Sequence, residues 1–435
     1  MVASYFYVIP VTQISHVATT DFRLYDMVFI FGLIFLLPHF GQLRANIRSH
    51  KWLSRYMFFS LWCVVTVVFN LFLLGYSQAF IAAGRLGRFM AYGLVAAAIL
   101  TFITKKEDLE KLVRFFFLLI ALQALLSTLQ SLGLVKQLWP DYWLQAGGQA
   151  GGYEDLPVGT LGLHHLHPGT LIVLGTSLGL GLLRYEKRLG VRLFITVSVV
   201  LMLYTSFIVV SRSAWLGLAI VVALFFLSLV KDPKKGAMLG AVFWLIVVIA
   251  CLIWLGGEGV QENISDSWNK GFEDKVEADG LTNLSPSRVA MWLDFPNVVM
   301  KHPWILIQGA GIQNAGRVLN IGVAMHNNYL HVIVETGIIG FYLYVTMLLA
   351  IWRQSSLVVQ AAEPGMGQAV IRGFRGAFAA LLVLNFFNEN FYMQYSSFSL
   401  TGQIMAFAAL SLHPLWIPSS ENKQLGVPSG DKKSH

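Results

Sequence analysis

The chain has 435 residues, of which 56% are hydrophobic and only 12% charged, and its mean hydropathy is +0.63. These values exclude a soluble globular protein and are typical of a polytopic helical membrane protein. The net charge of +8 comes mostly from Lys and Arg residues that flank apolar segments. It therefore reports membrane topology and gives no indication of nucleic-acid binding.

Eleven apolar runs predict membrane-spanning helices. They cover residues 22–38, 56–75, 89–103, 115–132, 168–183, 193–210, 214–230, 237–255, 328–352, 374–390 and 396–416. Residues 2–20 contain no Lys, Arg, Asp or Glu and are a candidate for a twelfth span, but they lack the basic start of a signal peptide. The sequence thus predicts an all-α polytopic membrane fold with about 12 transmembrane helices.

The apolar runs divide the chain into four parts. Residues 1–255 hold the N-terminal transmembrane helices, 256–327 a large loop, 328–416 the C-terminal transmembrane helices and 417–435 a polar tail that we expect to be disordered. Both cysteines, Cys63 and Cys251, fall inside predicted spans. No disulfide and no cysteine-based metal site is therefore expected.

Basic residues are distributed unequally between alternate loops. One set of loops, together with Arg375 and the C-terminal tail, holds 21 of the 31 Lys and Arg residues; these loops are 39–55, 104–114, 184–192, 231–235 and 353–373. Cytoplasmic loops are enriched in Lys and Arg, so we expect this set to face the cytoplasm. The large loop 256–327 then faces the opposite side of the membrane.

The large loop contains a predicted amphipathic helix. Ser285-Pro286 is a typical helix start, and an apolar face follows at Val289, Trp292, Phe295 and Val299. Pro296 should bend this helix and His302-Pro303 should end it. The next motif, Gly309-Ala310-Gly311, is most simply a turn, because no strand precedes it as a nucleotide-binding loop would require.

A polar cluster, His326-Asn327-Asn328-Tyr329, leads directly into an apolar run that contains Gly337-x-x-Gly340. The 25 residues from Asn328 to Trp352 are long enough to cross a hydrocarbon core of roughly 30 Å. His331 and Glu335, four residues apart, should share one helix face and point toward protein or water. Taken alone, His326 and the two asparagines are typical of a helix cap.

Four arginines lie on the non-cytoplasmic side, where topology does not favour them. Arg212 lies in a very short turn, Arg288 at the start of the predicted loop helix, and Arg85 and Arg88 near the same membrane face. A guanidinium group binds two phosphate oxygens at once and keeps its proton, which suits a diphosphate site. The simpler alternative, above all for Arg85 and Arg88, is that the side chains extend to lipid phosphates.

Two further groups of polar residues are predicted on the same side of the membrane. The motif NFFNENFY places Glu389 among asparagines, where it either lines a polar cavity or satisfies nearby backbone groups. Several histidines raise the alternative of a metal site, namely His164, His165, His167, His302 and His331. Because the loops contain no His-x-x-x-His pair with an acidic residue nearby, no metal is expected.

Together these segments resemble the O-antigen ligase and O-antigen polymerase superfamily. The resemblance rests on SRSAW around Arg212, SRVAMW with Arg288, HPW followed by GAG, and HNNYLHVIVETGIIG, which fits the ligase-type pattern His-Asn-x9-Gly-x-x-Gly. It implies a GT-C-like fold with a periplasmic helical loop, an undecaprenyl-diphosphate-linked glycan donor, and no metal or other cofactor. It also implies that Arg212, Arg288 and His326 are the functional residues.

This resemblance predicts a glycosyltransferase of the Gram-negative inner membrane, an O-antigen ligase that joins O-polysaccharide to a sugar hydroxyl of lipid A–core at the periplasmic face. Arg212 and Arg288 would hold the diphosphate, and His326 would act on the acceptor hydroxyl or on the leaving group. The predicted substrate-binding residues are Arg85, Arg88, Asn327, Tyr329 and Glu389. The expected partners are the lipid-linked donor, lipid A–core and membrane lipids.

Three alternatives remain. An O-antigen polymerase of the same superfamily shares the motifs, and a protein O-oligosaccharyltransferase uses the same kind of donor. A flippase or transporter of lipid-linked glycans would also need charged groups within the membrane. It would not need a loop helix and a histidine clustered on one face.

Overall fold

The computed structural model describes residues 10–12, 22–74, 76–135, 166–209, 211–230, 295–297, 299–301, 303–312, 314–315, 327–387, 391 and 398–418. The regular secondary structure in these residues is helical apart from one small sheet, which confirms the all-helical expectation for most of the part described. The α-helices are α2 (Leu24–Leu36), α3 (Phe40–Ser49), α4 (Lys51–Leu74), α5 (Tyr76–Phe102), α6 (Lys106–Ser131), α8 (Leu166–Leu183), α9 (Leu189–Ile208), α10 (Arg212–Val230), α15 (Trp304–Gln308), α17 (Asn328–Ala361), α18 (Met366–Leu384) and α19 (Phe398–Ser411). Two 3-10 helices, η1 (Leu37–His39) and η5 (Pro414–Trp416), adjoin them.

The small sheet lies near the N-terminus. Strand β1 (Pro10–Thr12) pairs antiparallel with β2 (Phe22–Arg23), so that Pro10 lies opposite Arg23 and Thr12 opposite Phe22. A strand at Pro10–Thr12 is incompatible with one helix running from residue 2 to residue 20. The candidate twelfth span is therefore wrong in the part of it that the structure describes.

Seven segments among the described residues are long and apolar enough to cross a membrane. They are Ile30–Ser49, Lys51–Phe69, Ala82–Phe102, Lys106–Ser131, Leu189–Ile208, Asn328–Ala361 and Met366–Leu384. Two shorter apolar helices, Pro168–Leu183 and Ser213–Ser228, add to them. Ten of the eleven predicted runs coincide with helices, and the run at 237–255 lies outside the described residues. The chain is a multi-pass membrane protein.

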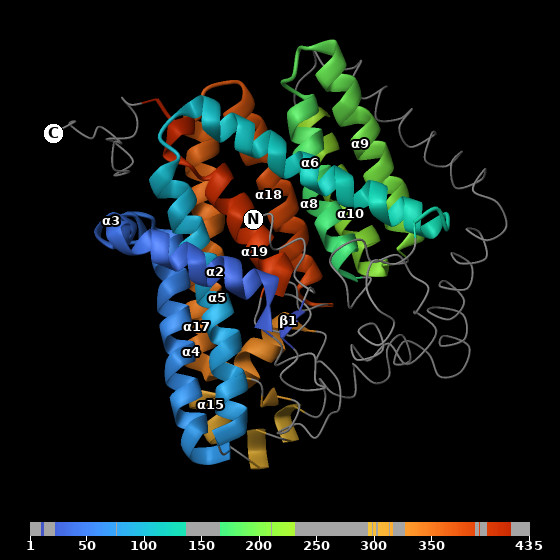
Figure 1. Ribbon diagram of the computed structural model, residues 1–435. Helices are drawn as coiled ribbons and strands as arrows, with labels where there is room; N and C mark the ends of the chain where they lie inside the picture. The colour runs from blue at the N-terminus through green and yellow to red at the C-terminus, as the bar shows by residue number, and fades with distance from the viewer. Residues whose placement is uncertain are drawn as a thin grey trace, which may run out of the picture.

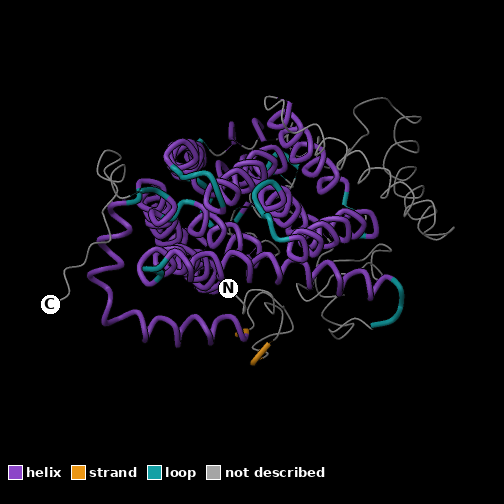
Figure 2. Tube along the Cα trace, turned by 90° about the horizontal axis from the view of Figure 1, so that it is seen from above, coloured by secondary structure: helices purple, strands orange, loops and turns teal. Residues whose placement is uncertain are grey.

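The first predicted span is a helix, but it is not packed into the bundle. Helix α2 lies across the outside of the bundle, roughly perpendicular to the long helices (Figures 1 and 2). Its apolar side chains Ile30, Phe31, Ile34 and Phe35 are exposed. Hydropathy thus predicted the helix correctly, whereas its crosswise position depends on packing that hydropathy does not report.

The long helices form two groups joined by α18 and α19. Figure 1 shows α4, α5 and α17 on one side and α8, α9 and α10 on the other. Helices α8 and α18 pack closely, and the Ser177 hydroxyl donates to the carbonyl of Gly373 at 2.6 Å. Small residues at such a contact allow two backbones to approach, the usual basis of helix association in membranes. This contact joins the two groups.

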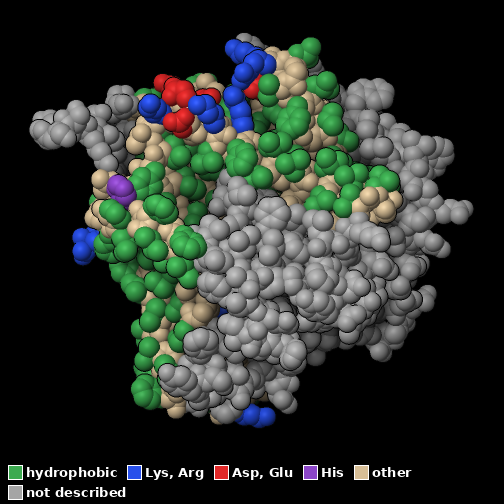
Figure 3. Space-filling view, viewed as in Figure 1, with side chains coloured by type: hydrophobic (Ala, Val, Ile, Leu, Met, Phe, Trp, Pro, Cys, Tyr) green, Lys and Arg blue, Asp and Glu red, His purple; other side chains and the backbone are tan. Residues whose placement is uncertain are grey.

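One end of the bundle gathers charged residues, and we call it the basic end. Lys106 pairs with Glu363 at 3.5 Å, which brings the start of α6 to the turn between α17 and α18. Tyr185 donates to Gln368 at 2.5 Å, which brings the end of α8 to the start of α18. Charged side chains on the visible face lie mostly at this end (Figure 3).

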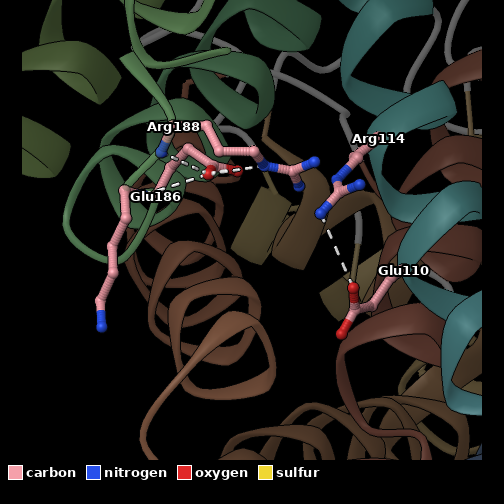
Figure 4. Close-up of polar contacts among 5 residues, drawn as sticks. Glu110, Arg114, Glu186 and Arg188 are labelled. Atoms are coloured by element: carbon pink, nitrogen blue, oxygen red, sulfur yellow. Dashed lines mark hydrogen bonds and ion pairs between the residues drawn. The ribbon is translucent and has the colours of Figure 1, made fainter. Parts of the chain in front are cut away.

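Local ion pairs occupy part of the basic end. Glu110 lies 3.6 Å from Arg114 on α6, and Glu186 lies 3.4 Å from Arg188 before α9 (Figure 4). Positively charged residues are enriched on the cytoplasmic side of membrane proteins. The basic end is therefore the predicted cytoplasmic end, and the other end of the bundle carries the beginnings of α10 and α17.

Candidate functional site

Helix α17 begins as a hairpin and not as a continuous span. Gly337 has φ 66° and ψ −173°, which interrupts the helix nine residues after it begins at Asn328. The Asn328 amide donates to the Tyr344 hydroxyl at 2.5 Å, although sixteen residues separate them. Only a chain that folds back at Gly337 can bring these side chains together. The span predicted at 328–352 is therefore helical, but it is broken at Gly337.

The Gly309-Ala310-Gly311 loop braces the break in α17. The N–H of Ala310 donates to the carbonyl of Val334 at 2.7 Å, and the N–H of Gly311 to that of Glu335 at 2.8 Å. These two carbonyls precede the break, where intrahelical partners are lost. The loop thus replaces helical hydrogen bonds, which gives the Gly-x-Gly motif a structural role.

Both glycines at this contact are required by geometry. Gly309 and Gly337 have positive φ, a region that L side chains rarely adopt. A Cβ on Gly337 would overlap the carbonyl oxygen of Ile307, and a Cβ on Gly309 would overlap that of Glu335. The backbones of the loop and of α17 therefore approach more closely than any other residue permits.

The described part of the large loop packs against this hairpin. Residues 295–297 and 299–301 are helical, as expected for the end of the loop helix, and α15 begins after Pro303. Ile305, Ala310 and Ala315 form a small buried cluster with Val334 of the hairpin. The loop is thus attached to the first turns of α17, close in sequence to His326.

Asn327 caps α17 as the sequence suggested. Its side-chain oxygen accepts from the N–H groups of Tyr329 and Leu330, both at 3.0 Å. The N–H of Asn328 donates to the carbonyl of Asn385 at 2.8 Å. The start of α17 is therefore fixed against the end of α18, and the residue before the cap is His326.

Tyr329, a predicted substrate-binding residue, is half-buried beside α18. Its hydroxyl donates to the carbonyl of Leu382 at 2.7 Å, and its ring lies 4.6 Å from that of Phe386. In this position Tyr329 holds the hairpin to α18. Its role toward a substrate remains a proposal.

His331 and Glu335 form a buried pair inside the hairpin. Their side chains lie 3.0 Å apart, from Nε2 to Oε1, and are 7% and 1% exposed. This confirms that both side chains share one helix face and point into the protein. Trp62 of α4 donates to the carbonyl of the next residue, Thr336, at 2.8 Å, so α4 covers this part of the hairpin.

Arg212 begins α10 at the same end of the bundle as Asn327. A Cβ on Gly217, in the second turn of α10, would touch Leu384, the last residue of α18. Asn385 follows and pairs with Asn328, so the end of α18 connects the starts of α10 and α17. The backbones at Arg212 and Asn327 thus flank the end of α18, while the Arg212 side chain lies outside the described residues.

Arg85 is buried and Arg88 half-buried on α5, next to the hairpin. Phe89, one turn after Arg85, stacks on Tyr56 at 4.7 Å and contacts Phe59, whose ring lies 5.4 Å from that of Tyr344. Arg85 is only 6% exposed. A side chain extended to lipid phosphates would be exposed, so this alternative is not supported for Arg85.

Three predicted site residues, His326, Arg288 and Glu389, lie outside the described residues. The structure therefore places the helix starts next to His326 and at Arg212. The side-chain positions of these two residues stay a prediction. Within the described ranges, no group of three His, Cys, Asp or Glu residues is arranged to hold a metal ion.

Comparison with known proteins finds a family match for the segment that contains α8, α10 and the start of α17. The family model of the O-antigen ligase matches residues 170–345, from α8 through the large loop to the fold-back of α17. A search of curated proteins finds no match. Members of the matched family are bacterial membrane glycosyltransferases that act on lipid-linked O-antigen. Residues 170–345 are therefore similar to the O-antigen ligase family, whose members are membrane glycosyltransferases of the ligase and polymerase type.

Proposed function

We propose that the protein is an O-antigen ligase of the Gram-negative inner membrane. It transfers O-polysaccharide from undecaprenyl diphosphate to a sugar hydroxyl of lipid A–core at the periplasmic face. The observation that carries this proposal is the braced, polar start of α17, directly after His326, in a segment that fits the pattern His-Asn-x9-Gly-x-x-Gly. The end of α18 joins this start to α10, which begins at Arg212.

The reaction needs little activation from the protein, because diphosphate is already a good leaving group. The acceptor hydroxyl oxygen attacks the anomeric carbon, and the bond from that carbon to the diphosphate oxygen breaks with its electron pair leaving on the diphosphate. A direct displacement inverts the anomeric centre. The tasks that remain are positioning, charge stabilisation and removal of the hydroxyl proton.

Each of these tasks has a candidate residue. Arg212 and Arg288 bind the diphosphate, since a guanidinium fork pairs with two phosphate oxygens and stays charged. His326 either takes the proton of the acceptor hydroxyl or, as imidazolium, stabilises the leaving diphosphate. Arg85, Arg88, Asn327, Tyr329 and Glu389 are proposed to line the substrate site. This mechanism requires no metal or other cofactor.

Replacing Arg212 or Arg288 by Lys keeps the charge and removes the fork. We expect transfer to fall about ten- to a hundredfold, because a hydrogen bond to a charged group contributes roughly 1.5–3 kcal/mol. Arg85→Lys should have a smaller effect, and Arg353→Lys, an exposed residue of α17 far from Gly337, serves as the matched control. If correctly inserted Arg212→Lys and Arg288→Lys proteins showed wild-type transfer rates, the proposal that these two residues bind the diphosphate would be rejected.

A deletion strain distinguishes ligase from polymerase. Loss of a ligase should leave lipid A–core without O-antigen, while long glycan accumulates on its lipid carrier. Loss of a polymerase should instead give lipopolysaccharide with at most one O-antigen repeat, which a gel resolves readily. Single-repeat lipopolysaccharide in the deletion strain would reject the ligase and favour the polymerase.

A further inference from the structure

A cavity of about 920 Å³ lies among α8, α10, α17 and α18, near the basic end. Three arginines line it: Arg184 from the turn after α8, and Arg372 and Arg375 from α18. We call it the arginine cavity. It is separate from the candidate site described above, which lies where α17 begins and α18 ends.

Two of the three guanidinium groups that line the arginine cavity are held in place. Arg184 donates to the Ser228 hydroxyl at 3.1 Å, and the guanidinium of Arg375 lies over the Trp352 ring, 4.8 Å from its centre. Arg372 and Arg375 are three residues apart on α18 and therefore lie on the same face of the helix. None of the described residues that line the cavity is acidic. A cavity of this kind favours an anion.

Arg372 and Arg375 lie within α18 and not in its first turn. Arg372 and Arg375 lie six and nine residues into α18. At 1.5 Å per residue they are about 9 and 13 Å from the start of the helix. Both are half-buried, whereas Arg353 at the same end is exposed. Both side chains line the arginine cavity together with Arg184, which a role in membrane orientation alone does not require.

The part of the cavity wall that α10 contributes is mostly apolar and reaches the outer surface of the bundle. Val221, Leu224, Phe225 and Leu227 of α10 line it, and Leu224 and Leu227 are exposed large hydrophobic residues. A soluble phosphate would leave this apolar wall uncovered. An amphiphile with a phosphate head group and an acyl chain would cover both parts of the lining.

We propose that the arginine cavity binds the phosphate head group of an anionic phospholipid from the cytoplasmic leaflet. The three guanidinium groups hold the phosphate, and the α10 side chains contact an acyl chain. Basic pockets between transmembrane helices on the cytoplasmic side are suited to such lipids. The site is independent of the proposed transfer reaction, which takes place at the opposite end of the bundle.

Native mass spectrometry of the purified full-length protein tests the proposal. Titration with phosphatidylglycerol should give one bound lipid at concentrations where phosphatidylcholine, which has no net charge, gives none. Inorganic phosphate should not displace it at equal concentration, because phosphate cannot contact the apolar wall. Equal binding of both lipids, or full displacement by inorganic phosphate, would overturn the lipid proposal.

Variants locate the bound lipid. Arg372→Gln, and Arg372→Gln combined with Arg375→Gln, should weaken phosphatidylglycerol binding by about tenfold or more, as expected for lost hydrogen bonds to a charged group. The matched controls are Arg353→Gln and Arg114→Gln, which remove the same charge outside the cavity. Unchanged binding by both folded cavity variants, or equal weakening by the controls, would contradict the assignment. If a variant does not fold, the titrations of the wild-type protein with phosphatidylglycerol and phosphatidylcholine still test whether the protein binds an anionic phospholipid.

Discussion

His326→Ala should leave the protein folded and inserted but reduce glycan transfer by about 10²–10⁴-fold, the usual contribution of general acid–base catalysis. The residue directly precedes the Asn327 cap, so its loss leaves the described hydrogen bonds of α17 intact. Transfer by purified enzyme, measured from a lipid-linked glycan to lipid A–core, gives the rate. His39→Ala, at the end of η1, is a matched control because His39 packs on Phe102 away from this site.

The pH dependence separates the two proposed roles of His326. A base acts only when neutral, so transfer should rise as the pH increases through the pKa of the imidazole. An imidazolium that stabilises the leaving diphosphate should give the opposite trend. Wild-type transfer by His326→Ala would reject both roles, and loss of wild-type activity on adding a chelator would favour a metal site.

Gly337→Ala should disrupt the hairpin and lower both stability and transfer. An L side chain in the left-handed region costs about 1–2 kcal/mol, and the overlap of its Cβ with the Ile307 carbonyl adds to this cost. The loop and α17 must then separate, which breaks the hydrogen bonds of Ala310 and Gly311. We expect a lower Tm in a thermal scan of the purified protein, and transfer near background.

A helical glycine with open space provides the control for Gly337→Ala. Gly41 in α3 has no neighbouring atom where a Cβ would stand, so Gly41→Ala should leave Tm and transfer close to wild type. If Gly337→Ala also behaved as wild type, the fold-back of α17 and its brace would be incorrect.

Hydropathy predicted the helices well because a membrane-spanning helix must be continuously apolar. The helices α4, α5, α6, α8, α9, α10, α17 and α18 all overlap the runs expected from the sequence. Most of them begin before the predicted runs, since polar residues at the helix starts continue the hydrogen-bond ladder outside the apolar core. The crosswise position of α2 was not predictable, because it depends on neighbouring surfaces and not on its own composition.

The hairpin of α17 could not be predicted from the apolar run 328–352. Glycine is tolerated inside membrane helices, so Gly337 alone does not indicate a break. The break depends on Gly309-Ala310-Gly311, more than twenty residues earlier, whose N–H groups replace the lost helical bonds. The sequence signal for this break was the presence of both Gly309-x-Gly311 and Gly337-x-x-Gly340. Only the fold shows that the two motifs are in contact.

Local features of the candidate site were predictable, and long-range ones were not. The Asn327 cap and the shared face of His331 and Glu335 follow from helix geometry and are confirmed. The partners of Asn328, Tyr344 and Asn385, come from distant parts of the chain and were missed. The proposed roles of Arg212, Arg288 and His326 rest on sequence motifs and chemistry.

Reconstituted transfer tests the ligase proposal most directly. The purified protein in lipid vesicles is given undecaprenyl-diphosphate-linked O-polysaccharide and lipid A–core, and products are separated on a gel. We predict that O-polysaccharide appears on lipid A–core with release of the lipid diphosphate, and that no product forms without lipid A–core. Growth of the lipid-linked glycan by further repeats, with lipid A–core left unmodified, would contradict the ligase proposal.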